Sequence, residues 1–361
     1  MLRFRAPSRP FDQFFRNEMP LELRSPLPPM EALSVDVIPE GPEWQYEPKW
    51  DGFRCIAFRD AGDVELQSKS QQPLGRYFPE VVQAVADLKA ERFVLDGEIA
   101  VPEGRGFSFD ALLQRIHPAA SRVTRLAAET PAIYVVFDLL ADENGRSLLS
   151  VPLRERRTLL EEFAAKFFPK AGSVRLSPAA SKLSQAKKWL SQTGATLDGI
   201  IAKRRDLEYR SGTRDGMQKI KNFRSADCVV GGFRYSSKSD VVGSLLLGLY
   251  DEGGLLHHVG FTSAIAAAKR PALTKKLEKL IAAPGFTGCA PGGPSRWNQG
   301  KENTWQPLKP QLVVEVSYDH VTGDRFRHGT KVLRWRPDKA PRQCTLEQIA
   351  QKQSNLMRLL K

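Results

Sequence analysis

Alternation of apolar and polar residues predicts β-strands in the first part of the chain. Two such stretches, Phe53–Phe58 and Val64–Gln67, flank the turn-forming residues Ala61-Gly62-Asp63, which predicts a hairpin. A third stretch, Phe93–Val101, places its apolar residues on one face and Asp96 and Glu98 on the other. Two acids on the second face of an apolar strand indicate either a pocket wall or a strand face open to water.

Other stretches have helical spacing or are apolar throughout. Pro79–Lys89 carries apolar residues three and four positions apart, which predicts an amphipathic helix that contributes to the core. The continuous apolar run Ile133–Leu140 predicts a strand buried on both faces. The pattern predicts three further helices: Ser108–Ile116 with Ser108 as its cap, Leu153–Phe167 and Ser184–Gln192.

From about Ala226 onward the pattern changes to short strands. Asp251-Glu252-Gly253-Gly254 favours a hairpin turn, and a helix-like insert, Ser263–Ala282, is interrupted at Pro271. Five strands and one helical insert predict a small Greek-key barrel of the oligonucleotide-binding (OB) kind. Thr345-Leu346-Glu347-Gln348 matches a capping box and predicts a terminal helix. The five strands are Cys228–Tyr235, Ser244–Tyr250, Leu255–Phe261, Leu312–Tyr318 and Val332–Trp335.

These changes divide the 361 residues into three parts. Residues 1–28 are rich in Pro and Arg and predict a poorly ordered lead-in, residues 29–225 form the first domain, and residues 226–361 form the barrel with its terminal helix. A hydrophobic content of 41% fits two domains with proper cores. Because no apolar run has the length of a bilayer span or a signal peptide, we expect a cytoplasmic protein without membrane contact.

Charge and cysteine content narrow the classes of partner and site. Lys and Arg number 54 against 41 Asp and Glu, a net charge of +13, which favours a polyanionic partner without selecting one. The four cysteines contain no Cys-x-x-Cys pair, which argues against a zinc ribbon or a disulfide framework. Thiols buried in a reducing compartment are the simpler interpretation.

The stretch with the clearest chemistry is Lys49-Trp50-Asp51-Gly52-Phe53-Arg54. A lysine amine has an ordinary pKa of about 10.4, so its attack on phosphorus requires cations or burial that lower this pKa. The position of Lys49 at the edge of a strand would let its side chain reach a pocket. Asp-Gly is also an ordinary hairpin signal, so the motif by itself leaves a structural role open.

This motif resembles the sequence Lys-x-Asp-Gly-x-Arg shared by ATP-dependent DNA ligases, RNA ligases and mRNA-capping guanylyltransferases. Five later segments, in the same order, most resemble small bacterial ATP-dependent DNA ligases and the ligase domain of bacterial end-joining enzymes; the resemblance covers residues 29 to 340. It implies an α+β fold, in which a nucleotidyltransferase domain of antiparallel sheets with flanking helices precedes an OB-fold β-barrel. The four-cysteine zinc module of NAD-dependent ligases is lacking in this sequence.

The resemblance also implies a role for each matching residue. It makes Lys49 the nucleophile that carries AMP and makes Glu98 and Asp198 the metal ligands. It assigns Arg336 and Lys339 to the departing pyrophosphate. The residues it implies for ATP binding are Glu47, Arg54, Lys69, Glu98, Phe137, Lys203, Lys219 and Lys221.

Three positions depart from the family's pattern. Asp198 replaces a glutamate that is one methylene longer, Met217 replaces an aromatic residue, and Lys69 follows Ser68 where the family has arginine. Lysine lacks the bidentate fork of arginine, so we expect weaker binding of AMP or of the DNA 5'-phosphate at Lys69.

The implied activity is ATP-dependent sealing of nicked double-stranded DNA in repair and recombination, with Mg²⁺ or Mn²⁺. We expect a monomer that associates with the bacterial nucleoid when it acts on DNA, with separate repair or end-joining proteins as partners. Two alternatives stay open: an RNA ligase or GTP-dependent capping-type guanylyltransferase, and a non-catalytic nucleic-acid-binding protein that keeps the fold.

Overall fold

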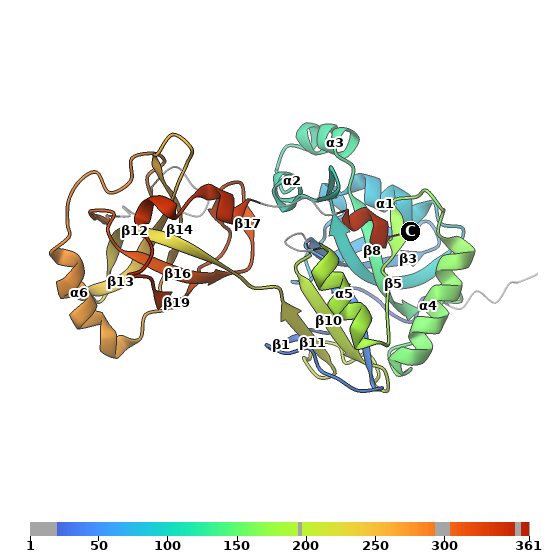
Figure 1. Ribbon diagram of the computed structural model, residues 1–361. Helices are drawn as coiled ribbons and strands as arrows, with labels where there is room; N and C mark the ends of the chain where they lie inside the picture. The colour runs from blue at the N-terminus through green and yellow to red at the C-terminus, as the bar shows by residue number, and fades with distance from the viewer. Residues whose placement is uncertain (1–19, 194–196, 293–303, 351–354, 361) are drawn as a thin grey trace, which may run out of the picture.

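The polypeptide folds into two lobes, which the computed structural model describes for residues 20–193, 197–292, 304–350 and 355–360 (Figure 1). The first lobe contains two mainly antiparallel sheets, with strand orders β4-β3-β5-β8-β9 and β1-β11-β10-β2, and the short hairpin β6-β7. Its strands are β1 (Leu33–Ser34), β2 (Trp44–Lys49), β3 (Phe53–Asp60), β4 (Asp63–Ser68), β5 (Arg92–Ala100), β6 (Pro102–Glu103), β7 (Gly106–Phe107), β8 (Ile133–Ala141), β9 (Val174–Leu176), β10 (Gly199–Arg204) and β11 (Met217–Lys221).

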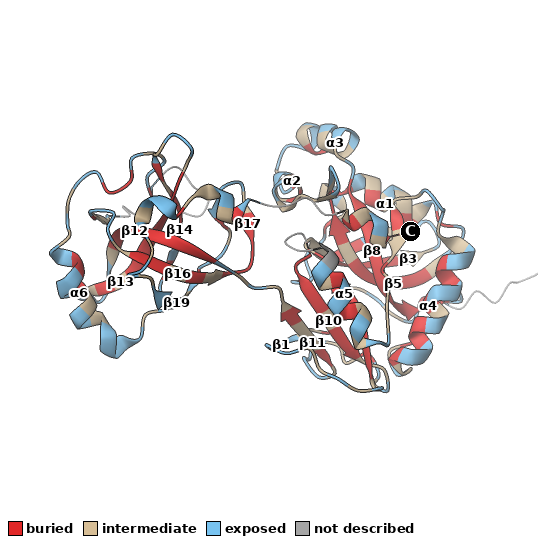
Figure 2. Cartoon of the chain, in the orientation of Figure 1, coloured by how far each residue is buried: buried red, intermediate tan, exposed pale blue. Residues whose placement is uncertain are grey.

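Helices cover the outer faces of these two sheets, and the strands make up most of the buried part of the lobe (Figure 2). Residues of α1 and α4 share one apolar cluster with the five-stranded sheet, and α5 packs on β2 and β10. The helices are α1 (Pro79–Ala86), α2 (Phe109–Gln114), α3 (Ala120–Glu129), α4 (Leu153–Phe167) and α5 (Leu183–Thr193), with a 3-10 turn, η1, at Gly75–Tyr77.

The predicted strand faces are observed in this lobe. Every residue of β8 is buried, because helices cover one face of its sheet and the second sheet covers the other. In β5, Leu95 packs into the cluster that contains α1 and α4, whereas Val94 faces the cluster between the two sheets. Ser108 caps α2, its hydroxyl accepting a hydrogen bond from the Ala111 amide at 3.2 Å.

The second lobe is built on the sheet β14-β13-β12-β16-β19, with β15 paired to β12 and a separate hairpin β17-β18. This arrangement of antiparallel strands is the expected OB fold. Its elements are β12 (Arg224–Ser236), β13 (Ser239–Tyr250), β14 (Leu256–Thr262), η3 (Ala267–Lys269), α6 (Arg270–Glu278), β15 (Gln306–Pro307), β16 (Val313–Tyr318), β17 (Val321–Thr322), β18 (Arg325–Phe326), β19 (Lys331–Trp335), η4 (Pro341–Gln343) and η5 (Leu346–Ile349).

Several local expectations need correction. Helix α3 was not expected, and Pro271 lies in the first turn of α6, where a proline without an N–H group is tolerated, so it begins a helix instead of breaking one. In place of the terminal helix, the described residues form two 3-10 turns, η5 and η6 (Leu356–Leu359). Within the lead-in, residues 1–19 lie outside the described residues, but Leu21 is buried against the first lobe.

The chain passes between the lobes twice. The first crossing falls between Lys221, the last residue of β11, and Arg224, the first residue of β12. After η5 in the second lobe, η6 packs back on the first lobe, beside the region that contains β8 (Figure 1). The described helices include none that is long and apolar enough to cross a membrane.

Candidate active site

Lys49 lies at the end of β2, opposite Gly199 of β10. The next residue, Trp50, is buried, and its indole N–H donates to the Ser177 hydroxyl at 2.9 Å. Gly52 follows in the same loop, where a Cβ atom would lie 2.2 Å from the Ile99 carbonyl oxygen, so no larger residue fits without a shift. Pairing on one side and burial on the other therefore fix the backbone that presents Lys49.

A cavity of about 210 Å³ opens on one side of Lys49, between the two sheets of the first lobe. Its walls bring together residues from β2, β3, β5, β8, β10 and β11 that are far apart in the sequence. All of the expected ATP-binding residues except Lys221 line it, and they share it with Lys49: Glu47, Arg54, Lys69, Glu98, Phe137, Lys203 and Lys219.

Two cations flank the aromatic ring in this cavity. The Arg54 guanidinium carbon and the Lys203 Nζ each lie 4.5 Å from the centroid of the Phe137 ring. Lys203 is also paired with the buried Glu47 at 2.8 Å. Phe137 is 8% exposed, so only a small part of its ring is open to a ligand in this arrangement.

A buried hydrogen-bond network holds Arg54. Its guanidinium contacts both carboxylate oxygens of Asp96 at 2.5 and 2.6 Å, and the pKa of Arg54 is raised because Asp96 outweighs the opposing effect of burial. The Tyr209 hydroxyl donates to Asp96 at 2.7 Å and accepts from the Met30 amide at 2.9 Å. Tyr209 had not been expected at the site, since a tyrosine in a loop carries no signal of such a partner.

Burial and nearby charges shift the proton equilibria around Lys49. Burial lowers the pKa of Lys49; Lys221 and Lys219 lower it further, while Glu98 and Asp51 act in the opposite direction. Burial raises the pKa of Glu98 to about 7. These effects make it easier for the Lys49 amine to lose its proton, and nucleophilic attack requires the neutral amine.

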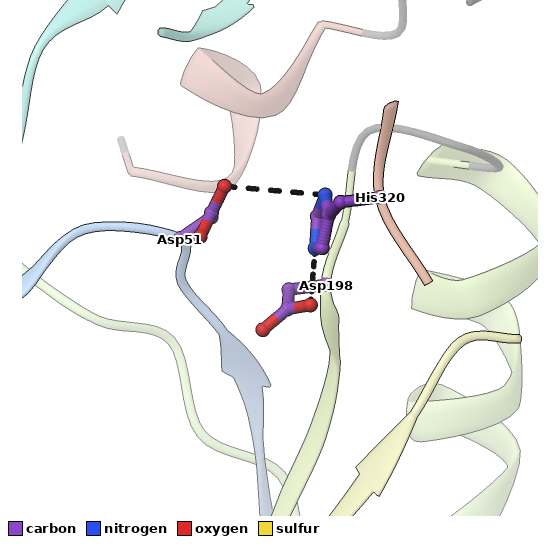
Figure 3. A group of neighbouring side chains, drawn as sticks. All are labelled: Asp51, Asp198 and His320. Atoms are coloured by element: carbon purple, nitrogen blue, oxygen red, sulfur yellow. Dashed lines mark hydrogen bonds and ion pairs between the residues drawn. The ribbon is translucent and has the colours of Figure 1, made fainter. Parts of the chain in front are cut away.

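On its other side, Lys49 meets a cavity of about 310 Å³ that both lobes line. The Lys49 Nζ contacts the Asp198 carboxylate. The His320 imidazole of the second lobe contacts the same carboxylate (Figure 3). Asp51 pairs with Arg327 at 2.7 Å and lies 4.0 Å from His320. Asp198, which was expected as a metal ligand, thus lies beside Lys49. The contribution of His320 and Arg327 was not foreseen.

Asp51, Asp198 and His320 are the described residues grouped closely enough to hold a metal ion, with ligand atoms within 4.8 Å of one another. Carboxylate oxygens suit Mg²⁺ or Mn²⁺, and an imidazole suits Mn²⁺ better. The donor set thus fits a divalent cation on the Asp198 side of Lys49. Glu98, the other expected ligand, is instead on the wall of the 210 Å³ cavity.

Lys221 faces the second lobe. Its Nζ pairs with the Asp319 carboxylate at 2.7 Å, and His328 contacts the same carboxylate at 3.0 Å. Although burial opposes ionisation, the hydrogen bonds from Lys221 and His328 hold the pKa of Asp319 well below its usual range. The Asp319 carboxylate therefore contacts Lys221, the cation that was expected to contact a phosphate.

The structure does not bring Arg336 and Lys339 to Lys49. Arg336 pairs with Asp227 at 2.9 Å and with Asp338 at 2.8 Å, and Lys339 lies 3.6 Å from Asp227. Neither cation is among the described residues that line the two cavities beside Lys49. In this arrangement the end of the second lobe that contains η5 faces the site, since Ile349 lines the larger cavity.

Two of the departures from the family's pattern also have a structural context. The Lys69 side chain is 58% exposed and pairs with Glu31 at 3.2 Å, which leaves its amine at the rim of the cavity. Met217 is buried in the cluster between the sheets, and its side chain there fills space without presenting an aromatic face.

Comparison with known proteins gives matches across both lobes. A family model described as ATP dependent DNA ligase domain matches residues 29–221, and one described as ATP dependent DNA ligase C terminal region matches residues 238–339. The DNA ligase C2 of Mycolicibacterium smegmatis is 45% identical over 92% of this chain and 96% of its own length. The multifunctional non-homologous end joining DNA repair protein LigD of Mycobacterium tuberculosis is 30% identical over 84% of this chain, but over only 38% of its own length.

A solved structure of a Lig E DNA ligase matches the fold. It has a TM-score of 0.51 and 16% identity, and the match covers 85% of this chain and 99% of that one. At this identity the likeness concerns the arrangement of the two lobes' elements alone.

Proposed function

Because the chain belongs to the ATP-dependent DNA ligase family, we propose that it seals DNA nicks through a lysyl-AMP intermediate on Lys49. The observation that carries this assignment is the position of Lys49. Its amine lies between a cavity lined by cations around an aromatic ring and the carboxylate of Asp198.

ATP occupies the 210 Å³ cavity in this proposal. The Phe137 ring faces the adenine, a role that requires Arg54 and Lys203 to leave room on one side of the ring. Glu98 and Arg54 lie where the sugar would bind, and Lys203 and Lys219 provide positive charge for the α-phosphate. Lys221 joins them once Asp319 releases it.

In the first step the Lys49 Nζ attacks the α-phosphorus of ATP. An N–P bond forms, the P–O bond to pyrophosphate breaks, and Asp198 is placed to accept the proton that the amine loses. The lowered pKa of Lys49, caused first by burial, makes the neutral amine easier to form. Arg336 and Lys339 stabilise the leaving pyrophosphate only in another orientation of the second lobe, because here they are paired with Asp227.

The next two steps use DNA. The 5'-phosphate oxygen takes the adenylyl group and releases Lys49; the 3'-hydroxyl then attacks the 5'-phosphorus and expels AMP. A divalent cation beside Asp198 would stabilise negative charge on the phosphate oxygens. We further propose a monomer that works with separate end-joining or repair proteins on nicked duplex DNA.

Incubation with α-labelled ATP and Mg²⁺, followed by a denaturing gel, tests the proposal. The wild type should retain the label and then transfer it to nicked DNA, whereas Lys49→Ala should take up none. Lys89→Ala, which removes an exposed lysine of the same lobe, is the matched control and should be labelled like the wild type.

Three outcomes would contradict the proposal in whole or in part. Labelling by GTP in place of ATP would indicate a capping-type enzyme. Labelling of Lys49→Ala to the same extent as the wild type would show that another group is the nucleophile. Transfer to nicked RNA in preference to nicked DNA would change the acceptor and leave the role of Lys49 intact.

A further inference from the structure

The segment Asn355–Leu360, which contains η6, leaves the second lobe and packs beside the nucleophile in the first. We name it the strap. Its residues Leu356 and Leu360 are 2% and 4% exposed, while Arg358 between them points to solvent. The Leu356 amide donates to the Arg105 carbonyl at 2.8 Å, so the strap is joined to the β6-β7 hairpin through its backbone as well.

One end of the strap covers the residue next to Lys49. Leu360 shares an apolar cluster with Trp50, Val135 and Phe137, and Met357 packs against this cluster. Trp50 also meets the ring of Phe107 edge to face, with 5.8 Å between centroids. The indole beside the nucleophile is therefore enclosed partly by the sheet and partly by the strap.

The other end of the strap covers the residue next to Asp198. Leu356 belongs to the cluster of Tyr46, Leu197 and Ile200, which lies under α5. Leu356 and Leu197 also line the 310 Å³ cavity together with Lys49. The strap thus packs beside Trp50, which follows Lys49 in the sequence, and beside Leu197, which precedes Asp198.

The position of these two groups depends on a single strand end. Lys49 is the last residue of β2, and Gly199, which pairs with it, directly follows Asp198. Beyond this pair the backbone of each strand leaves the sheet, so side-chain packing has to fix the direction of the Lys49 amine and the Asp198 carboxylate. The strap supplies that packing on both strands.

The strap also connects the two lobes. Ile349 of η5 is in the core of the second lobe, and Ala350 is only five peptide units from Asn355. Five residues span at most about 18 Å when fully extended. A docked strap therefore keeps the η5 end of the second lobe close to Lys49.

We propose that the strap is a positioning element for the nucleophile: Leu360, through Trp50, and Leu356, through Leu197, hold Lys49 and Asp198 in the geometry for attack on ATP. This inference rests on the proposed role of Lys49. In this proposal Leu356 and Leu360 act through the residues that they pack against.

The test compares Leu360→Ala with Leu360→Met and with the exposed control Arg358→Ala. The rate of lysyl-adenylate formation at saturating ATP should fall about tenfold or more in Leu360→Ala, since small misplacement of a reacting group is costly, while the KM for ATP stays within about twofold. Leu360→Met, which keeps the volume, should restore the rate. Arg358→Ala should behave like the wild type.

A second measurement separates positioning from general damage. Joining of a nick that already carries a 5'-adenylate does not require attack by Lys49. The rate of this reaction in Leu360→Ala should therefore stay within about threefold of the wild type. Misplacement of the attacking amine causes a far larger loss. Equal losses in both reactions, or a loss confined to the KM for ATP, would overturn the inference. If Leu360→Ala does not fold, Leu360→Val removes one carbon and is measured in the same two reactions.

The same experiments distinguish the two proposals. A wild type that takes up no label contradicts the role of Lys49. A wild type that is labelled normally, together with a Leu360→Ala variant labelled at the same rate, contradicts the role of the strap alone. Leu356→Ala repeats the comparison at the Asp198 end, where adenylation should again fall more than joining of the adenylated nick.

Discussion

Asp96 has no exposed surface, and its two oxygens are shared between Arg54 and Tyr209. An ionised carboxylate at such depth is costly unless charged and polar groups satisfy it. Here Arg54 supplies the charge and Tyr209 the additional donor. Tyr209 in turn accepts a hydrogen bond from the Met30 amide. Tyr209 therefore links Met30 to the carboxylate that holds Arg54, and both Met30 and Arg54 line the 210 Å³ cavity.

Substitution of Tyr209 by phenylalanine should show the value of this link. The variant leaves Asp96 and the Met30 amide each short of a buried partner, which we expect to cost about 1–3 kcal/mol of unfolding free energy. Because Met30 and Arg54 both line the ATP cavity, the KM for ATP should rise as well. Tyr235→Phe is the control, since its hydroxyl meets Glu278 on an exposed surface of the other lobe. Denaturant unfolding gives the free energy of unfolding, and the rate of lysyl-adenylate formation against ATP concentration gives the KM. If neither value changes in Tyr209→Phe, the expectation is contradicted.

At this scale the sequence indicated which charged and aromatic side chains gather beside Lys49. The spacing in Lys49-Trp50-Asp51-Gly52-Phe53-Arg54 and the resemblance to a known family indicated about half of the residues that line the 210 Å³ cavity. The partners of those residues were not predicted. Tyr209, His320 and Arg327 reach the site from loops, where no periodicity indicates which way a side chain points.

Among the elements, α4 is fastened to β8 by a buried ion pair. Arg156 contacts both oxygens of Asp138 at 2.9 and 3.0 Å, and the two side chains are 2% and 4% exposed. The pKa of Asp138 is lowered because Arg156 outweighs the effect of burial. Asp138 directly follows Phe137, so the pair also fixes the register of the strand that carries the ring.

Arg156→Ala should therefore destabilise the first lobe strongly. It leaves the Asp138 carboxylate buried without its charged partner, a change that costs about 3–5 kcal/mol. The double variant Arg156→Met with Asp138→Leu removes both charges and keeps apolar volume, so it should be markedly more stable than Arg156→Ala alone. Thermal unfolding of the wild type and both variants makes the comparison. A double variant less stable than Arg156→Ala would show that the pair itself, and not the unpaired charge, determines stability.

Strands were predicted better than helix ends in this chain. The alternation in β5 and the apolar run of β8 follow directly from two-sided packing, which the sequence displays. Helix α3 buries only Val123, and three of its five apolar residues are alanines, so its pattern gave little signal. The capping-box sequence at Thr345 reports only on its immediate neighbours. The residues that follow pack on both lobes, Ile349 on the second and Leu360 on the first, and they form 3-10 turns there.

For the whole molecule, the net charge of +13 predicts how binding to DNA depends on salt. Lysines and arginines that contact phosphates release counterions, so affinity should fall steeply as salt increases. With six or more such contacts, the loss between about 50 and 200 mM salt is about a thousandfold or greater. Fluorescence anisotropy of a nicked duplex with the Lys49→Ala variant measures binding without turnover. An affinity that stays nearly constant over this range would contradict the prediction.

The placement of the second lobe could not be predicted from the sequence. The polar contacts that define it at the site include Lys221 with Asp319, Asp51 with Arg327, and Asp198 with His320. Each joins residues more than 90 positions apart, and surface charges of this kind have many possible partners. The family resemblance predicted Arg336 and Lys339 at the site, and the structure instead pairs them with Asp227.

The strap has a consequence for how an active molecule is made. Trp50 and Leu360 are more than 300 positions apart, and contacts between distant positions form late because a long loop has to close first. During synthesis, the first lobe can bury most of its core before residues 355–360 exist. The surroundings of Lys49 are completed only after the ribosome has produced both lobes, so a nascent chain with a folded first lobe would still lack the packing of residues 355–360 beside Trp50.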